Sequence, residues 1–250
     1  MKYLHIGFFI VLLSGFLPVF SQNLLWPITH YIPAHHKVAD GTVSGFFIEI
    51  VEEALTRRSG YQIQTEIHPW ARCQIMVRNG LADFITTVPT PERLEWSVMV
   101  PTPFWIKQYR LFTWDGHPRL NEINSIQSIQ DLRTSGLTVI SYKGNNWSKT
   151  HLEDAGITVI NANSVESMYR MLIAQRGDLI VEDPILVTAT TKDLGLYNRL
   201  AKTRGIVEES AFHLLIGKKS QLVHSADKID FILKQMWNDG TIERILDRYR

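Results

Sequence analysis

The segment Thr90-Pro91-Glu92-Arg93 combines residue types that suit the binding of an anion. Thr90 is a typical helix N-cap, and Pro91 fits the first helical position. The first backbone N–H groups of a helix have no partner inside the helix and carry partial positive charge. The Arg93 guanidinium adds a planar fork that can grip a carboxylate with two hydrogen bonds. The segment predicts an anion site at a helix start; the alternative is an ordinary capped helix with a solvated arginine.

The elements that must position this segment alternate between helical and strand periodicity, which is typical of an α/β fold. Ligands of such folds bind beyond the carboxyl ends of the strands, often between domains. The pattern predicts a first block of helix, strand, helix and strand, a second block of strands alternating with helices, and two C-terminal helices. The first block covers residues 46–60, 61–67, 69–79 and 83–88; the strands of the second are 137–142, 157–160 and 178–182.

Composition excludes several classes of protein. The chain has 250 residues, of which 26 are basic and 25 acidic, so its net charge is +1. A protein that mainly holds nucleic acid needs an excess of Lys and Arg, and this chain has none. The single cysteine, Cys73, excludes an intrachain disulfide and a Cys-rich zinc site. We expect Cys73 to be buried on one helical face with Trp70, Val77 and Leu81.

The N-terminus predicts an export signal. Lys2 precedes an apolar run over residues 3–20, and the small residue Ser21 follows it. A basic start, a short apolar stretch and a small-residue exit are typical of a secretory signal peptide. We expect cleavage after Ser21, so that 1–21 is a signal peptide and the product is periplasmic. The alternative is an uncleaved anchor, which would need about 20 apolar residues, and Pro18 shortens this run.

Other side chains that could do chemistry form weaker patterns. His30, His35 and His36 are close in sequence, but they lack the fixed spacing of a zinc site, so we expect no metal and no cofactor. Glu182 and Asp183 are adjacent carboxylates at the end of a predicted strand. Neighbours in a strand point to opposite faces, so this pair is poorly placed for joint acid–base catalysis.

An ordered series of short motifs runs through the chain. It comprises Tyr31-Ile32-Pro33, Gly45-Phe46-Phe47-Ile48-Glu49, Pro69-Trp70-Ala71-Arg72, Asn79-Gly80, Thr90-Pro91-Glu92-Arg93, Gly144-Asn145, Arg176-Gly177-Asp178 with Asp183, and Trp237-Asn238-Asp239-Gly240. The series resembles the family 3 bacterial extracellular solute-binding proteins, the periplasmic amino-acid-binding receptors of ABC importers. This resemblance implies an α/β, two-lobed periplasmic-binding-protein-like (type II) fold with hinge crossovers. It places lobe 1 at 22–112 plus 208–250 and lobe 2 at 113–207.

The resemblance also implies a ligand site between the lobes. Arg93, in the T-x-x-R pattern that begins at Thr90, would hold the ligand carboxylate, and Asp183 would accept the ligand ammonium. Tyr31 would pack on the ligand, and the backbone N–H groups of Gly144-Asn145 would meet its carboxylate.

The chain departs from the family pattern at several positions. Phe47 and Val88 stand where an acidic residue and a Ser or Thr are usual, so Thr86 and Thr87 are candidates to supply hydroxyl groups. The Pro-Trp-x-Arg motif points to a separate branch, in which Trp70 and Arg72 either face the cleft or are a core aromatic and a surface charge. These departures put a standard α-amino acid ligand in doubt more than they question the fold.

We therefore expect an exported, monomeric receptor that captures a small polar, amino-acid-like solute between closing lobes, without turnover, for an ABC permease. One alternative is an enzyme on the same scaffold, because some cyclohexadienyl dehydratases resemble this family; Glu182 or Glu49 would then act as general acid. Another alternative is a ligand-sensing receptor that signals to a membrane partner.

Overall fold

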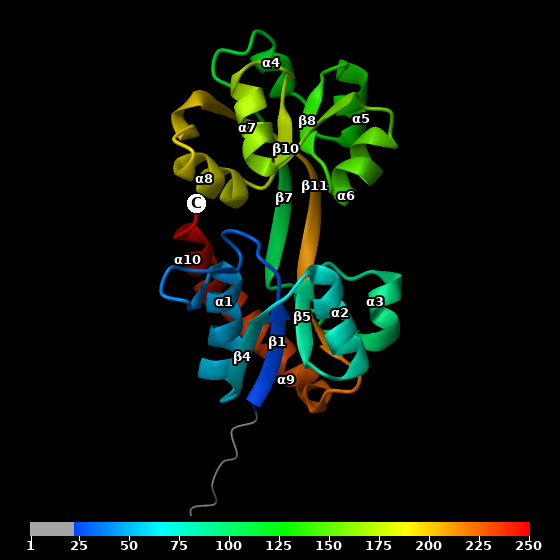
Figure 1. The fold of residues 1–250 in the computed structure, drawn as a ribbon, viewed down its shortest axis with the longest axis vertical. Helices are drawn as coiled ribbons and strands as arrows, with labels where there is room; N and C mark the ends of the chain where they lie inside the picture. The colour runs from blue at the N-terminus through cyan, green and yellow to red at the C-terminus, as the bar shows by residue number, and fades with distance from the viewer. Residues whose placement is uncertain (1–22) are drawn as a thin grey trace, which may run out of the picture.

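Two groups of helices and strands lie one above the other and are joined by two long strands (Figure 1). The computed structural model describes residues 23–250, without the side chains at 146 and 202. The predicted signal peptide, 1–21, therefore lies outside the described residues. The joining strands are β7 (Trp105–Trp114) and β11 (Leu200–Gly217), which pair antiparallel with Leu200 opposite Trp114 and Phe212 opposite Trp105.

The first lobe is built on strands that run towards the junction. β1 (Asn23–Ile28) pairs parallel with β4 (Gln62–Ile67). Asp83 links β1 to β5 (Phe84–Thr87), because its Oδ2 accepts a hydrogen bond from the Leu25 N–H at 2.7 Å. β5 and β6 (Ser97–Met99) both pair antiparallel with the lower end of β11. The carboxyl ends of β1 and β5 thus meet at the edge that faces the second lobe (Figure 1).

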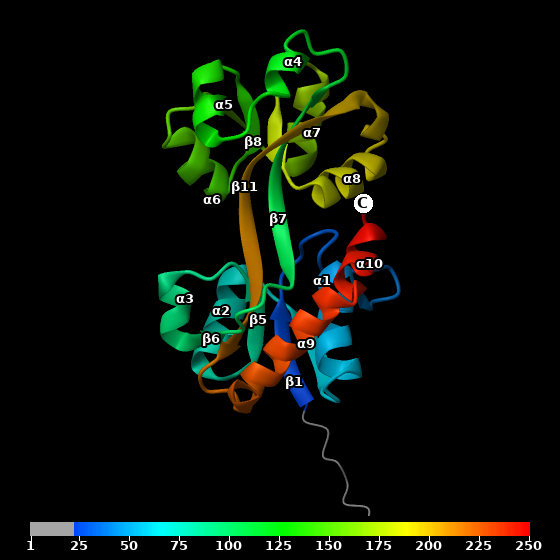
Figure 2. The same ribbon diagram turned by 180° about the vertical axis from the view of Figure 1, so that it is seen from behind.

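Helices cover both faces of this sheet, and α9 and α10 cross its rear side (Figure 2). They are α1 (Phe46–Val51), which continues as the π-helical turn η1 (Glu52–Arg57), α2 (Trp70–Asn79), α3 (Pro91–Trp96), the 3-10 turn η4 (Gln221–Ser225), α9 (Ala226–Asn238) and α10 (Thr241–Asp247). The short strands β2 (His36–Lys37) and β3 (Val43–Ser44) form a hairpin ahead of α1.

The entry to α1 depends on a glycine. Gly45 has φ of 132°, and a Cβ at this position would lie 2.3 Å from the carbonyl oxygen of Ala34. Only glycine tolerates both the backbone conformation and the close approach. The contact brings Phe46 and Phe47 into the core, where the Phe47 ring meets the Phe104 ring edge to face at 4.7 Å between centroids.

The second lobe has a separate core around three short strands. β8 (Val139–Tyr142) pairs parallel with β9 (Val159–Ala162), and β10 (Ile180–Glu182) pairs antiparallel with β7. The surrounding helices are α4 (Leu120–Ile123), α5 (Ile129–Ser135), α6 (Asn146–Ser148) with the π-helical turn η2 (Lys149–Glu153), α7 (Val165–Ile173), α8 (Pro184–Asp193) and the 3-10 turn η3 (Tyr197–Arg199).

β11 connects the two lobes as one continuous strand. Its pairing with β7 is irregular between Lys202 and Ile206 and again between Ile206 and Glu208. Such bulges let a strand bend without losing its partner. The predicted lobe boundaries, 112/113 and 207/208, fall inside β7 and β11, and the division at those residues stays a prediction.

Most predicted elements are present, with one local error. Cys73 is fully buried as expected, but Leu81 is 67% exposed and does not share its face. α2 ends at Asn79, and Gly80 adopts a left-handed conformation with φ of 78°, which turns the chain before Leu81. Within residues 23–250, no helix has the length and apolar character needed to cross a membrane.

Candidate functional site

The predicted anion-binding segment forms the start of α3. Thr90 is the N-cap in an extended conformation, and its Oγ1 accepts a hydrogen bond from the Arg93 N–H at 3.3 Å. Pro91 occupies the first turn, where its missing N–H costs nothing. The cap predicted from the sequence is confirmed, and it fixes the backbone that carries Arg93 beside the carboxyl end of β5.

Three neighbours hold the Arg93 guanidinium in place. Nε donates to Gln74 Oε1 at 3.0 Å, and Nη1 donates to the Val88 carbonyl oxygen at 2.8 Å. The guanidinium carbon lies 5.4 Å from the centre of the Trp70 ring, within range of a cation–π contact. Gln74 and Trp70 both belong to α2, so two helices and the end of a strand define the orientation of this cation.

Arg93 is a half-buried cation without a carboxylate partner. Among the described residues it makes no ion pair, and burial lowers the pKa of its guanidinium, with only Glu92 acting in the opposite direction. A guanidinium has five N–H donors, and the bonds to Gln74 and Val88 use two of them. The remaining donors can bind an anion, whose charge would offset the burial of the cation.

Trp70 and Arg72 lie on different sides of α2. Trp70 is half-buried, packs against the core cluster around Cys73 and contacts the Arg93 guanidinium. Trp70 therefore packs like a core aromatic and also touches the cation of the predicted anion site, which are the two roles that the sequence left open. Arg72 is exposed and forms no ion pair among the described residues. Whether either side chain meets a ligand stays a prediction.

Tyr31, Thr86 and Thr87 lie at the carboxyl ends of β1 and β5. Thr86 and Thr87 are buried and stand opposite Leu214 and His213 of β11. Tyr31 follows β1 and forms a two-way backbone bridge with His35 at 2.9 Å. His35 is buried, and burial lowers the pKa of its imidazole to about 4. In residues 23–250 no group of three metal-ligating side chains gathers around it.

Asn145 shapes the loop that follows β8. Its Oδ1 accepts a hydrogen bond from the Ser148 N–H at 3.1 Å, and its Nδ2 donates to Ser141 Oγ at 3.3 Å. Its own N–H donates to the Tyr142 carbonyl oxygen at 3.1 Å. The side chain and the backbone N–H are thus occupied within the loop, and the predicted contact with a ligand stays untested.

Asp183 is the N-cap of α8, and both its carboxylate oxygens accept backbone hydrogen bonds. Oδ1 accepts from the Ile185 N–H at 2.8 Å, and Oδ2 accepts from the Gln108 N–H at 2.9 Å. The residue is 2% exposed, and burial raises the pKa of its carboxyl group to about 6 against the opposing effect of these bonds. Its predicted role as the ammonium ligand remains a prediction.

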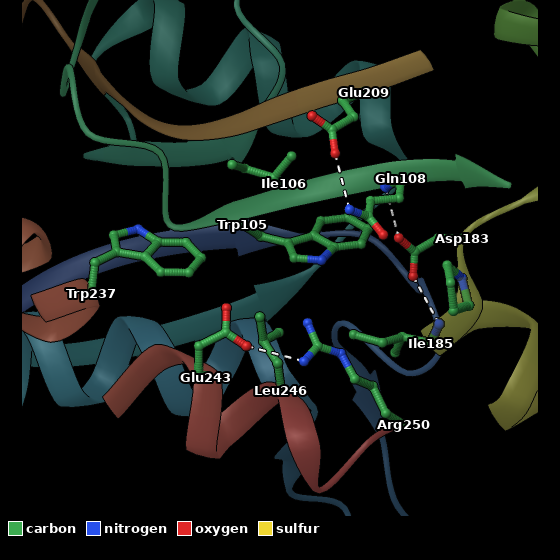
Figure 3. Close-up of a pocket in the computed structure, with 11 residues that line it drawn as sticks. Trp105, Ile106, Gln108, Asp183, Ile185, Glu209, Trp237, Glu243, Leu246 and Arg250 are labelled. Atoms are coloured by element: carbon green, nitrogen blue, oxygen red, sulfur yellow. Dashed lines mark hydrogen bonds and ion pairs between the residues drawn. The ribbon is translucent and has the colours of Figure 1, made fainter. Parts of the chain in front are cut away.

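Asp183 lines a cavity of about 180 Å³ between the lobes, next to β7 (Figure 3). Trp105, Trp237 and the Arg250 guanidinium line it as well. Arg250 Nη1 is bound by Glu243 at 3.0 Å and Asp247 at 2.8 Å. Glu49, a general-acid candidate for the enzymatic alternative, is bound to Arg248 and Tyr249 near the same C-terminal segment.

Lys107 and Glu182 form a buried ion pair that the sequence analysis missed. Lys107 Nζ lies 2.6 Å from Glu182 Oε1, and the two side chains are only 10% and 9% exposed. Burial alone would lower the pKa of the Lys107 ammonium, but the charge of Glu182 holds that pKa well above its usual range. The buried Lys107 directly follows the apolar run Phe104-Trp105-Ile106, and this position was the signal that could have revealed the pair.

Tyrosines from both lobes surround this pair. The Lys107 ammonium lies 4.7 Å from the centre of the Tyr109 ring. Burial raises the pKa of the phenols of Tyr31, Tyr109 and Tyr142. The charge of Lys107 lowers these three pKa values, and the charge of Glu182 raises them. Tyr31 belongs to the first lobe and Tyr142 to the second, so the pair lies where the strand ends of both lobes converge.

Two α/β lobes, two connecting strands and a set of polar side chains at the converging strand ends define a two-lobed binding-protein fold. The chain belongs to the bacterial extracellular solute-binding proteins, family 3, whose family model matches residues 28–250. The resemblance inferred from the sequence motifs is thereby confirmed. A comparison with curated proteins found no match.

Solved structures confirm the expected type II fold. A probable amino-acid ABC transporter extracellular-binding protein from Bacillus subtilis is 17% identical, with a TM-score of 0.72 over 91% of this chain and 98% of that chain. The L-cystine solute receptor of Neisseria gonorrhoeae, in its unliganded open conformation, is 16% identical, with a TM-score of 0.69 over 92% of each chain. An ancestral amino-acid-binding protein, a precursor of cyclohexadienyl dehydratase, is 18% identical, with a TM-score of 0.63 over 91% and 95%. At these identities the likeness shows the fold alone.

Proposed function

We propose that this protein is a periplasmic receptor that binds a small carboxylate-bearing, amino-acid-like solute between its two lobes and delivers it to an ABC permease. The observation that carries the proposal is Arg93, a half-buried guanidinium with free donors and no carboxylate partner among the described residues. A solute carboxylate supplies the missing anion. The predicted ligand set around it is Tyr31, Trp70, Arg72, Thr86, Thr87, Thr90, Asn145 and Asp183.

The mechanism needs only a change in lobe separation. The solute carboxylate binds Arg93 in the first lobe, and the remainder of the solute meets groups of the second lobe. Closing the lobes removes water, which strengthens the charged contacts. The solute favours the closed state by as much as it binds that state more tightly, and no bond is broken. We expect a monomer to suffice, because Arg93 and its three neighbours all come from one chain.

A thermal-shift screen of the processed protein tests this proposal. The panel contains amino acids, small peptides, polyamines and organic acids. A solute at 100 times its Kd stabilises the fold by about 2.7 kcal/mol, which gives a clear rise in Tm. We expect hits only among carboxylates, and small-angle X-ray scattering should show a more compact molecule with each hit. Hits confined to polyamines, or no carboxylate hit, would contradict the proposal.

The enzymatic alternative is separated by a different assay. Incubation with prephenate or arogenate would yield an aromatic product if the protein is a dehydratase, and we expect none. The sensing alternative is separated by capture of membrane partners on the immobilised, solute-loaded protein. A permease among the captured proteins supports transport, whereas a membrane-bound signalling protein favours sensing.

A further inference from the structure

A second set of polar groups lies at the junction of the lobes, apart from Arg93. We call Tyr31, Lys107, Tyr109, Tyr142 and Glu182 the interlobe cluster. Its members come from the loop after β1, from β7, from the end of β8 and from the end of β10. On β11, Ser210 pairs with Lys107 and His213 pairs with Thr87, at the end of β5. Three residues of strand span about 10 Å, so the cluster lies about that far along β11 from the end of β5.

The cluster contains polar atoms that the protein leaves unused. Glu182 Oε1 takes both the Lys107 ammonium and the Asp183 N–H, the latter at 2.8 Å. Among the side chains that the structure describes, no partner forms a hydrogen bond with Glu182 Oε2 or with the hydroxyls of Tyr31 and Tyr142. Lys107 has three N–H donors and uses one on Glu182. The cluster can therefore donate several hydrogen bonds and accept at least one.

The charges of the cluster cancel. Lys107 and Glu182 neutralise each other, and the three phenols stay uncharged because burial raises their pKa. A charged solute group placed against a neutral, buried pair gains little Coulomb energy and loses its hydration. An ammonium group there would also lie beside the Lys107 ammonium, and like charges repel.

Asp183 does not supply the missing negative charge to this cluster. It follows Glu182 directly, but it lies with Ile106 and Gln108 at the cavity of Figure 3, which neither Lys107 nor Glu182 lines. Two backbone N–H groups bind its carboxylate, and it sits at the positive end of the α8 dipole. The charge that a solute must match is therefore the unpaired positive charge of Arg93.

We propose that the solute is a small monoanion, namely a 2-hydroxy or 2-oxo acid that carries no ammonium group. This inference rests on the proposed function, because it assumes that a solute carboxylate binds Arg93. Lys107 and the tyrosine hydroxyls donate to the uncharged oxygen atoms of the solute, and Glu182 Oε2 accepts from its hydroxyl group. The interlobe cluster discriminates against the corresponding α-amino acid, whose ammonium group finds no free carboxylate.

Calorimetry on matched pairs of probes tests the inference. The pairs are L-lactate with L-alanine, 2-hydroxyisocaproate with L-leucine, and phenyllactate with L-phenylalanine; pyruvate extends the first pair to the oxo acid. In the parent protein, we expect the hydroxy or oxo acid of at least one pair to bind 10-fold or more tightly than its amino acid. Tighter binding of the amino acids, or binding of no probe in the panel, would overturn the inference.

Lys107→Met supplies the discriminating variant, because it frees the Glu182 carboxylate to accept an ammonium group. We expect this variant to reverse the preference in favour of the amino acid. The double variant Lys107→Met with Glu182→Gln removes both charges of the pair together, which protects folding, and should reduce the preference to within about threefold. An unchanged 10-fold preference in the double variant would overturn the inference. If amino acids bind more tightly but the binding still needs Arg93, the proposed function stands and only this inference falls.

Discussion

Glu182 and Asp183 are consecutive residues, yet their carboxylates bind different groups of β7. Glu182 Oε1 lies 2.6 Å from Lys107 Nζ, whereas Asp183 Oδ2 accepts a hydrogen bond from the Gln108 N–H at 2.9 Å. β10 ends at Glu182 and Asp183 is already the N-cap of α8, so the chain leaves the strand between the two side chains. One carboxylate therefore takes part in the cluster between the lobes, and the other caps α8 beside the cavity of Figure 3.

The buried Asp183 carboxyl group predicts a specific pH dependence of stability. Its pKa in the folded protein is about 6, above the ordinary value of 3.8, because burial disfavours the carboxylate. The folded state then binds more protons than the unfolded state, so this group lowers the free energy of unfolding as pH rises from about 4 to about 6. This shift in pKa corresponds to a loss of at most about 3 kcal/mol in the free energy of unfolding.

Asp183→Asn removes this titration and retains an N-cap oxygen. Urea unfolding at several pH values should show the variant gaining stability relative to the parent between about pH 4 and pH 6, with a constant difference above pH 7. A difference that does not change across this window would show that Asp183 titrates normally.

Gln74 can be used to compete with the solute for Arg93. Gln74→Glu places a carboxylate where Oε1 now accepts the Arg93 Nε bond, and the resulting ion pair occupies the guanidinium. We expect the affinity for the tightest carboxylate from the thermal-shift screen to fall 10-fold or more, with little change in Tm. Gln74→Met, which removes the hydrogen bond without adding charge, is the control and should lower affinity only a few-fold. Equal affinities in the two variants would argue against a carboxylate at Arg93.

The local features of the site could be predicted from the sequence because they depend on neighbouring residues. The cap at Thr90, the turn at Gly80 and the burial of Cys73 follow from residue preferences within a few positions of the chain. Leu81 shows the limit of this reasoning. The helical spacing placed it on the buried face, but α2 has already ended at Asn79.

The contacts made across the fold could not be predicted in this way. Lys107 and Glu182 are 75 positions apart, and the antiparallel pairing of β10 with β7, which ends with Glu182 opposite Arg110, brings their two segments close together. The partners of Arg93 are a similar case, because Gln74 lies on another helix. The residue types in both sets of contacts were visible in the sequence, but no local pattern shows which distant segments pair or pack together.

Thr90 is expected to act on both stability and binding. Thr90→Ala removes the side-chain oxygen that accepts the Arg93 N–H bond, and loss of such a cap costs about 1 kcal/mol. Denaturant unfolding should show this loss, and calorimetry should show weaker solute binding because the backbone of Arg93 is less well fixed. Thr90→Ser keeps the hydroxyl group and should behave like the parent. Parent-like stability of Thr90→Ala would show that the 3.3 Å contact contributes nothing.

Cys73 is expected to be unreactive in the folded protein. Its side chain is fully buried, its Sγ lies 3.6 Å from the His68 carbonyl oxygen, and burial raises the pKa of the thiol to about 11. Since the thiolate is the reactive form, a thiol reagent at pH 8 should label the native protein very slowly. In denaturant it should label one thiol per chain. Rapid labelling of the native protein would show that this part of α2 opens readily.

Solute binding is expected to depend most directly on Arg93 as the carboxylate ligand, and Arg72 provides a matched control on a neighbouring surface. Calorimetry should compare Arg93→Ala and Arg72→Ala with the parent, using the tightest carboxylate from the screen. Removal of one partner of a buried charged contact costs about 2–5 kcal/mol, so we expect Arg93→Ala to bind at least about 30-fold more weakly. Arg72→Ala should bind within a few-fold of the parent. Parent-like affinity in a folded Arg93→Ala protein would contradict the account.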